Sequence, residues 1–435
     1  MRGQLIAGAV VAGLAAGLAV PAAALPAGTP AHRGDDQPGD HGPGGHSGSG
    51  GHGRPFDFTP LAGSAYGVAT PDWAQPFLLP QGYTQSLVAD ETVLDVYPGA
   101  DDLSDMTTVN ETGRQAGRFL YRTHEVDANG ALSVVDLRTG AAEVIAQDAG
   151  WRRLDGLEWT PWGTLLFAEE TAGGRLFEAF LDPHDPTVVA RIEARPQVGI
   201  LRHEGIAATR DAVYVVDELN GGSIYKFVPA RRGDLSTGQL YALKLTGIAD
   251  ADQLWNPAAY SAKVGEFDWV PLDMAQAVVD GDAAANAVVA TEFGRPEDLQ
   301  VIGDTLYVAN TSEDRVIAID LRAERVTGFV EAGVNLPVED AANGVTGFNS
   351  PDNLAATADG RLIVIEDNVP SDIWFAGADR NRDGVADRVD LFASLVDPGA
   401  EGSGIYVGTD PRTLYVDVQH PDKPQADGTW RITRG

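Results

Sequence analysis

The feature that most constrains the fold is a strand–turn–strand pattern that recurs along the chain. In residues 154–170, a short apolar segment leads to a turn at Trp162-Gly163, and a second β-rich segment ends in Glu169 and Glu170. Related units recur about every 40–50 residues, a spacing typical of solenoids and propellers. Each unit has an acidic residue at the start of its first apolar segment, at Asp155, Glu204, Glu297, Asp352 and Glu401.

The residue types within these units predict an all-β fold. Alternation with a period of about two, together with β-branched and aromatic residues, favours strands. Asp-Gly, Asn-Gly and Pro-Asp pairs between the apolar segments favour tight turns. A four-stranded blade needs about as many residues as one unit, and roughly six units are present. We therefore predict a six-bladed β-propeller, preceded by a disordered segment and interrupted by one inserted, partly helical segment.

The recurring acids predict a metal site. Equivalent positions of successive blades lie on one ring around a propeller axis, so we expect the five acids to converge at one mouth of the channel. Clustered carboxylates raise one another's pKa unless a counter-charge is present, and multivalent cations supply that charge most simply. Ligand sets made only of carboxylates favour hard ions such as calcium. The alternative is ordinary turn chemistry, in which an acid simply precedes a strand.

The N-terminal region predicts export. Residues 1–24 combine a charged start, an apolar run over residues 5–20 and small residues at 22–24, which is typical of a secretion signal rather than a membrane span. Residues 25–55 are rich in Gly, Pro and His, and we expect a disordered linker there, although its histidines could bind a metal weakly. Residues 56–435 would then form a single propeller domain, secreted to the periplasm or the extracellular space.

Composition narrows the possible partners. The chain has no cysteine, which excludes disulfides and thiolate metal sites. Its formal net charge of -32 argues against nucleic acid or an anionic membrane as a partner and suits cation binding. We expect a monomer with no membrane span.

Two regions depart from the repeat. Residues 246–289 read as an insertion, within which residues 273–279 and the Ala-rich run after Gly281 are predicted to be helical. Residues 56–105 form a lead-in that either packs against the propeller or closes its ring.

A separate calcium signal lies in residues 379–390. The order of residues fits the loop D-x-[DN]-x-[DN]-G-x5-[DE], with Gly384 at the sharp turn. In such a loop, alternate side chains turn inward around one ion. A solvated acidic turn is the alternative. The predicted ligands are Asp379, Asn381, Asp383, Asp387 and Asp390.

Taken in order, several motifs resemble the PhoX-type alkaline phosphatases. They are residues 162–170, 203–205, 233–243, 295–297, 350–352 and 419–421. The resemblance extends from about Arg118 to the C-terminus. It implies an exported six-bladed propeller that hydrolyses small phosphate monoesters with a cluster of iron and calcium ions at the channel mouth.

The resemblance also implies roles for individual residues. Glu204 and Glu297 correspond to carboxylate ligands of the cluster, and Glu169 or Glu170 corresponds to a calcium ligand. Asp352 and Glu401 are further candidate ligands. Arg295 resembles the arginine that holds the substrate phosphate, a role that suits the planar fork of a guanidinium. Otherwise Arg295 is a surface arginine paired with Asp298.

The chain departs from the family pattern at Ala168, where the family has a cysteine that ligates iron. Alanine has no ligand atom, so we expect calcium as the cofactor and regard iron as doubtful. Catalysis could persist with calcium alone, or another residue could replace the thiolate. Alternatively the protein is a non-catalytic calcium-binding propeller, or a calcium-dependent lactone hydrolase.

Overall fold

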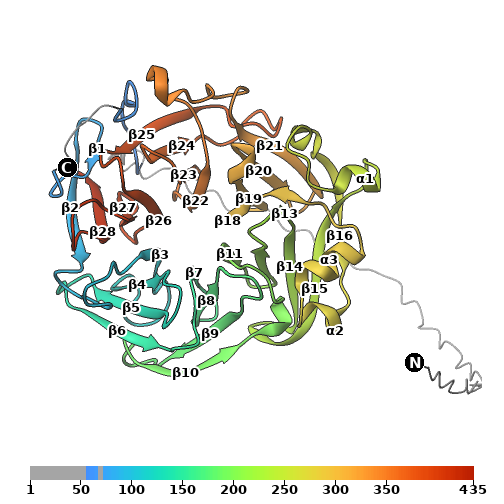
Figure 1. The fold of residues 1–435 in the computed structure, drawn as a ribbon, viewed down its shortest axis with the longest axis horizontal. Helices are drawn as coiled ribbons and strands as arrows, with labels where there is room; N and C mark the ends of the chain where they lie inside the picture. Colours follow the sequence, from blue (N-terminus) through green and yellow to red (C-terminus); the bar gives the residue numbers. More distant parts are fainter. Residues whose placement is uncertain (1–54, 67–71) are drawn as a thin grey trace, which may run out of the picture. The chain divides into compact units, whose positions relative to one another are not determined.

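The computed structural model describes residues 55–66 and 72–435. The predicted signal segment and all but the last residue of the predicted linker lie outside these ranges. Sheets of antiparallel strands surround a central axis, as Figure 1 shows, and the predicted all-β propeller is confirmed. Within the described ranges, no helix combines the length and the apolar character that crossing a membrane requires.

Two four-stranded sheets begin the ring. Their strands alternate in direction and connect through short turns, one of which has Gly163 at a φ of +84°. Both faces of each sheet are covered, so β-rich segments such as residues 165–168 are buried on both sides. The first sheet contains β3 (Ser104–Val109), β4 (Phe119–His124), β5 (Ala131–Asp136) and β6 (Ala142–Gln147). The second contains β7 (Leu154–Trp159), β8 (Leu165–Glu169), β9 (Leu176–Leu181) and β10 (Val189–Ala194).

A nine-stranded sheet follows, in which β16 (Gly265–Pro271) joins two four-stranded meanders by pairing with β15 and β21. The first meander contains β11 (Ile206–Ala208), β12 (Val213–Val216), β14 (Ile224–Arg231) and β15 (Asp234–Leu245). The second contains β18 (Pro296–Ile302), β19 (Thr305–Asn310), β20 (Arg315–Asp320) and β21 (Arg325–Glu331). A separate small sheet pairs β13 (Asn220–Gly222) with β17 (Phe293–Gly294).

The inserted segment contains both predicted helices and the unpredicted strand β16. Aspartate side chains cap the two helices, since Asp273 accepts from the amide of Ala275 and Asp280 from that of Ala283. The α-helices are α1 (Asp250–Gln253), α2 (Met274–Ala277) and α3 (Gly281–Ala287). The 3-10 helices are η1 (Pro196–Val198), η2 (Tyr260–Ala262), η3 (Thr311–Glu313) and η4 (Ala341–Asn343).

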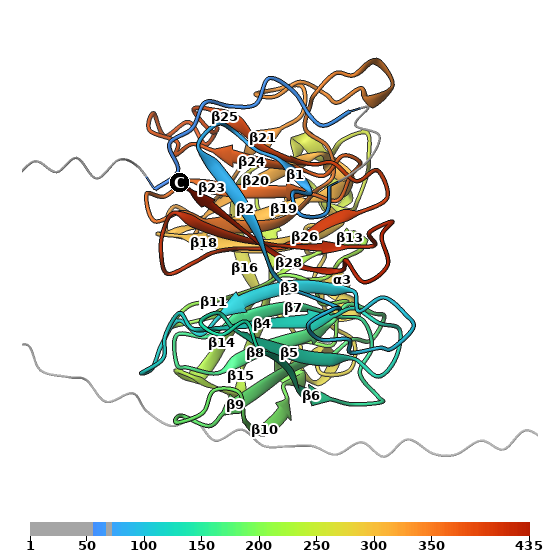
Figure 2. The same ribbon diagram turned by 90° about the vertical axis from the view of Figure 1, so that its left-hand side faces the viewer.

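The last two sheets take strands from both ends of the domain. The lead-in supplies their outer strands, and Figure 2 shows β2 lying beside β28. The lead-in therefore closes the ring and also packs Phe56 into the core. One sheet contains β1 (Phe77–Leu78), β25 (Val389–Leu395), β24 (Asp372–Ala376), β23 (Leu362–Glu366) and β22 (Pro351–Ala356). The other contains β2 (Tyr83–Asp90), β28 (Gly428–Arg434), β27 (Thr413–Gln419) and β26 (Glu401–Val407).

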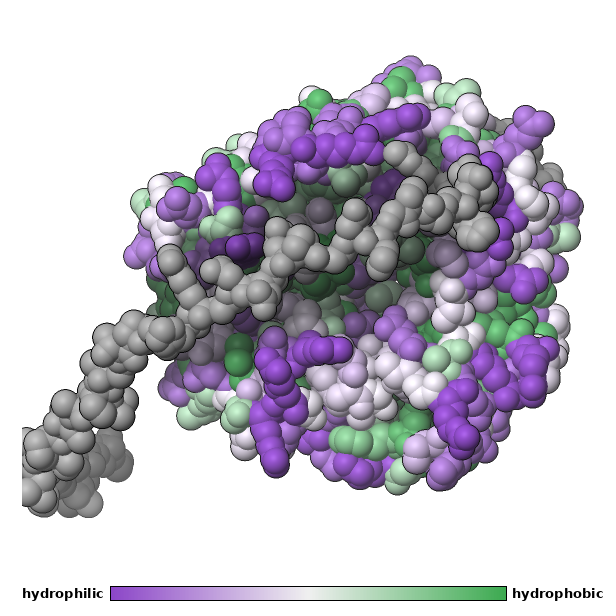
Figure 3. Space-filling view, turned by 180° about the vertical axis from the view of Figure 1, so that it is seen from behind, coloured by the Kyte–Doolittle hydropathy of each residue, from purple (hydrophilic) through white to green (hydrophobic). Residues whose placement is uncertain are grey.

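The innermost strands are β3, β7, β11, β18, β22 and β26, and each contacts its neighbours around the axis. The sheets do not separate into six independent blades, because β16 merges two meanders into one sheet. The apolar core lies between adjacent sheets; Tyr121 of β4, for example, stacks on Trp159 of β7 with ring centroids 5.8 Å apart. The face opposite to Figure 1 has hydrophilic residues around a hollowed centre, as Figure 3 shows.

Candidate metal centre

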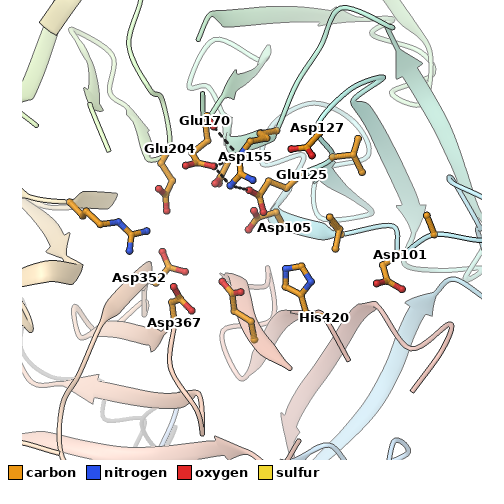
Figure 4. Close-up of a pocket in the computed structure, with 16 residues that line it drawn as sticks. Asp101, Asp105, Glu125, Asp127, Asp155, Glu170, Glu204, Asp352, Asp367 and His420 are labelled. Carbon is orange, nitrogen blue, oxygen red and sulfur yellow. Dashed lines mark hydrogen bonds and ion pairs between the residues drawn. The ribbon is translucent and has the colours of Figure 1, made fainter. Parts of the chain in front are cut away.

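A cavity of about 510 Å³ lies where the innermost strands begin. Its wall is strongly acidic, and Figure 4 shows carboxylates from several sheets pointing into it. Since equivalent positions of the sheets meet here, a pattern repeated in the sequence becomes a ring in space. The charged and histidine residues of the wall are Asp101, Asp105, Glu125, Asp127, Arg153, Asp155, Glu170, Glu204, Arg295, Asp352, Asp367, Glu401 and His420.

The first group of acids stands at the starts of the inner strands, where bulges turn the side chains inward. The pairing of β7 with β8 shifts between Leu154 and Leu157, so that Asp155 lies in the irregular part. The pairings of β3, β18 and β22 with their neighbours shift at the equivalent place. A bulge bends the strand and redirects its side chains. The acids of this group are Asp105, Asp155, Glu204, Glu297, Asp352 and Glu401. Glu401 differs from the others in that it pairs regularly with Gln419, ahead of the shift between Gly402 and Ile405.

A second group of polar residues stands just after the second strand of five of the sheets or meanders. Its members are Glu125, Glu170, Glu218, Thr311 and Asp367. A hydrogen bond ties it to the first group, because the amide of Glu170 donates to the carbonyl of Arg153 at 2.8 Å. Arg153 lies two residues before Asp155 and has a φ of +44°, a strained value for a non-glycine residue. The same bond joins Glu125 to Leu103, Glu218 to Arg202, Thr311 to Arg295, and Asp367 to Ser350.

Three arginines alternate with four glutamates in a continuous ion-pair chain, which we call the arginine belt. It is formed by Glu125, Arg153, Glu170, Arg202, Glu218, Arg295 and Glu297. Arg153 contacts Glu125 and places its Nη2 2.5 Å from Glu170 Oε2. Arg202 Nη1 lies 2.9 Å from both Glu170 Oε1 and Glu218 Oε2. Arg295 Nε lies 2.5 Å from Glu218 Oε1, and its Nη2 lies 3.1 Å from Glu297 Oε1.

Two trios of buried carboxylates are close enough to hold a cation. One is Glu170, Glu204 and Glu218, and the other is Glu204, Glu297 and Asp352; within each, one oxygen per residue lies within 4.8 Å of the others. Neither oxygen of Glu297 accepts a hydrogen bond within the described ranges, and neither does Asp155 Oδ1. Buried carboxylate oxygens that accept no hydrogen bond are costly, and a hard cation would satisfy them. The donor set therefore fits calcium.

Burial is the main influence on these acids. It raises the pKa of Glu170 and Glu401 to about 8 and that of Glu297 to about 7. The pKa values of Glu204 and Asp352 are raised well above their ordinary values by burial and then by Glu297. Burial also acts upward at Glu218, but Arg295 and Arg202 outweigh it and lower its pKa. The arginine belt thus favours the ionised form of Glu218. The carboxylates of the second trio, by contrast, need a bound cation or protons to offset their burial and mutual repulsion.

The structure brings most of the predicted ligands together, with Glu169 as an exception. Glu170, Glu204, Glu297, Asp352 and Glu401 all lie at the cavity or in its trios. Glu169 points elsewhere, and both of its oxygens lie 2.7 Å from the guanidinium of Arg175. Arg295 also lines the cavity, and its partners are Glu218 and Glu297 rather than Asp298.

The predicted calcium loop lies apart, between β24 and β25. Its acidic side chains form turns within the loop; Asp379 Oδ2 accepts from the amide of Gly384 at 2.7 Å. Asn381 and Asp383 are joined at 2.9 Å, and Asp387 accepts from the amide of Arg380 at 3.2 Å. Asp390, in the last ligand position, pairs instead with Arg388 at 2.7 Å.

Ala168 contributes no ligand atom. It is fully buried on β8 and packs in an apolar cluster with Leu166, Leu176 and Leu201. The position predicted for a cysteine ligand is therefore part of the apolar core.

Some functional candidates were missed by sequence reasoning. The second-strand ends Glu125, Glu218 and Asp367 and the arginines Arg153 and Arg202 were not predicted. A usable signal existed, because Arg153, Arg202 and Arg295 each stand two residues before an acid of the first group. This R-x-[DE] pattern occurs at the same place in three consecutive units.

Comparisons with solved structures agree with this architecture. The fold is similar to PhoX from Pseudomonas fluorescens in complex with vanadate, a transition state analogue, with a TM-score of 0.61 and 17% identity. That similarity covers 87% of this chain and 98% of that chain. A catalytically inactive virginiamycin B lyase from Staphylococcus aureus with quinupristin matches with a TM-score of 0.45 and 14% identity, over 81% of this chain and 99% of that chain.

Sequence comparison supplies the assignment. The comparison with curated protein sequences found no match. A family model described as alkaline phosphatase PhoX matches residues 158–422, which is more than half of the 435-residue chain and contains five of the seven residues of the arginine belt. The chain therefore belongs to the PhoX family of alkaline phosphatases.

Proposed function

We propose that this protein is an exported phosphomonoester hydrolase that depends on calcium and acts in the acidic cavity. The observation that carries the proposal is the second trio, in which Glu204, Glu297 and Asp352 converge beside Arg295. Family membership supports the reaction class, and the cavity supports the place. A volume of about 510 Å³ suits a small phosphate ester, because ligand pockets usually enclose roughly 300–1,000 Å³.

Arg295 would bind the phosphoryl group of the substrate. Glu218 fixes its Nε at 2.5 Å, and this contact orients the guanidinium at the cavity wall. A guanidinium held in this way can offer parallel N–H donors to two phosphoryl oxygens. Arg295 is held before substrate arrives, so little conformational freedom is lost on binding.

Glu204, Glu297 and Asp352 would hold calcium, with Asp155 and Glu401 completing the acidic wall. A bound divalent cation supplies positive charge against the phosphoryl oxygens and favours ionisation of water. The residues of this chain position the ester, separate it from bulk solvent and keep the carboxylate oxygens directed toward one point.

We also propose the finer structural readings. The two meanders joined by β16 count as two blades, which gives six in total, and the protein acts as a monomer. Residues 379–390 form a second, structural calcium site. The hydrogen bonds that Asp379 and Asp383 accept from loop amides support it, because they already order these two carboxylates.

The test is hydrolysis of a chromogenic phosphate monoester by the protein beginning at residue 25. We expect turnover with calcium, loss of turnover with a chelator, and recovery when calcium is restored. Added iron tests the role of the missing thiolate, and elemental analysis reports the ions retained. Absence of turnover under every metal condition would contradict the proposal. Bound calcium without turnover would then indicate a binding propeller, and activity restricted to a lactone panel would indicate a lactone hydrolase.

A further inference from the structure

The two carboxylate trios of the cavity share Glu204 but differ in their contacts with basic side chains. In the trio of Glu170, Glu204 and Glu218, two members are joined by one arginine. In the trio of Glu204, Glu297 and Asp352, the only ion pair within the described residues is the 3.1 Å contact of Arg295 with Glu297. We infer that Arg202 fills the first trio with its own guanidinium, so that only the second trio takes a divalent cation.

The position of Arg202 is that of a bridging cation. Its Nη1 lies 2.9 Å from an oxygen of Glu170 and 2.9 Å from an oxygen of Glu218. One nitrogen thus joins two carboxylates, as a metal ion between them would. Charge-assisted hydrogen bonds of this length are among the stronger polar contacts in proteins.

The backbone of Arg202 holds the side chain in this place. Its amide donates to Asp217 Oδ1 at 2.8 Å, and its carbonyl accepts from the amide of Glu218 at 3.0 Å. Both ends of the residue are therefore attached to the turn that carries Glu218. Because the arginine and its acidic partner belong to one rigid unit, the pairing needs little further ordering.

The neighbouring arginines reinforce the difference between the trios. Arg153 contacts Glu170, and Arg295 contacts Glu218, so both glutamates already have two cationic partners. A divalent cation at the first trio would be repelled by the guanidinium groups a few ångströms away. The Glu297 carboxylate oxygens of the second trio, by contrast, accept no hydrogen bond within the described residues.

This inference rests on the proposed cation dependence and adds to it the number of trios that bind calcium, which is one. The glutamates of the first trio serve to hold arginines, and calcium belongs to the second trio. Arg202 is a positioning residue in this scheme, because it acts through Glu170 and Glu218 rather than on substrate.

The experiment measures bound calcium per chain by equilibrium dialysis, without substrate, for the wild-type protein and three variants. Arg202→Met removes the charge but keeps much of the apolar stem, and we expect it to bind one additional calcium ion per chain. Arg202→Lys keeps a cation and should bind the wild-type number. Glu218→Gln should also bind the wild-type number, because Glu218 holds arginine rather than calcium. Any ion in the 379–390 loop is common to all four proteins and cancels in the comparison.

Two results would overturn the inference. One is an unchanged calcium count in folded Arg202→Met, and the other is the loss of one ion in Glu218→Gln. Thermal unfolding establishes that each variant is folded; if Arg202→Met fails to fold, Glu218→Gln decides the matter. A protein that hydrolyses no phosphate ester could still give the expected counts, so failure of the proposed activity is distinguishable from failure of this inference.

Discussion

Arg295 and Glu218 stand 77 positions apart in the sequence, yet their Nε and Oε1 atoms lie 2.5 Å apart. The contact joins the segment before β18 to the segment after β12, which belong to different meanders of the same nine-stranded sheet. Arg295 also has a left-handed φ of +47°, a conformation that costs on the order of 1 kcal/mol for a non-glycine residue. The surrounding structure therefore holds this arginine in place against a local preference.

Arg295→Ala should reduce kcat/KM for a phosphate monoester by about 100-fold, or about 2.7 kcal/mol, the loss typical of removing one fixed donor from a reacting oxyanion. The kcat/KM of Arg295→Lys should lie between those of the wild type and of Arg295→Ala, because an ammonium keeps the charge but lacks the planar fork of donors. Steady-state kinetics measure the effect. Arg232→Ala is a suitable control, since the Arg232 side chain is 77% exposed and pairs only with Asp211. Equal kinetics for Arg295→Ala and the control would remove Arg295 from the site.

The metal-free protein should become less stable as pH rises from about 5 to 8. Burial raises the pKa of Glu170 and Glu401 to about 8 and that of Glu297 to about 7, against 4.5 for an ordinary glutamate. A raised folded-state pKa contributes stability that is complete below the unfolded value and is lost as pH passes through the folded value. Urea unfolding with a chelator at several pH values measures this trend.

Calcium should flatten that profile, because the bound ion favours ionised carboxylates and offsets their repulsion. The same titration with saturating calcium is therefore the matched measurement. Metal-free stability that instead increased toward pH 8 would show that these carboxylates are not the controlling groups.

Glu169 should differ in function from Glu297, which is a ligand in the second trio. Glu297→Gln should weaken calcium binding at least tenfold, about 1.4 kcal/mol, because it removes one anionic ligand. Glu169→Gln should leave calcium affinity unchanged and lower the free energy of unfolding by about 1–2 kcal/mol, since Arg175 is 42% exposed and partly screened. Calorimetric calcium titration and urea unfolding separate the two effects. A loss of calcium affinity in Glu169→Gln would return that residue to the ligand set.

Removal of residues 55–90, which include β1 and β2, should destabilise the ring and lower its unfolding temperature. A chain beginning at residue 91 lacks the strand that pairs with β28 from Tyr83↔Arg434 to Asp90↔Gly428, which would expose an unpaired sheet edge. A chain beginning at residue 55 keeps this pairing and is the matched control. Thermal unfolding and light scattering should show a lower transition temperature and association for the shorter chain. Equal melting of the two chains would mean that the ring does not depend on this strand.

Local sequence patterns predicted most strands of the propeller but not the merged sheet. Residues 362–365 are apolar and mostly β-branched and follow the Asp359-Gly360 turn, so β23 was evident. β16 was not predicted, because Gly265–Pro271 lies in a segment without the repeat and pairs partly with Val326, which is remote in sequence. Such a pairing depends on which edges meet in space, and periodicity does not encode it.

The candidate site was predictable where the repeat marked it. The acids at five of the six inner-strand starts were predicted from the sequence, and Glu204, Glu297 and Asp352 do converge. Asp105 of β3 was missed, because it lies in the lead-in where the repeat was not recognised. The sequence did not decide between Glu169 and Glu170. Adjacent residues at a strand end point to opposite sides, and the pattern does not say which side faces the cavity. Glu218 and Arg202 were missed since their roles follow from contacts between sheets, although the R-x-[DE] repeat pointed to the arginines.

The pairing of β2 with β28 sets an order of events during synthesis. Residues 83–90 are synthesised well before their partner strand, Gly428–Arg434. Closing so long a loop is slow relative to local pairing, so we expect this pairing to form later than the hairpins within each sheet. The ring of sheets therefore stays open at one edge until β28 has been synthesised and has paired with β2.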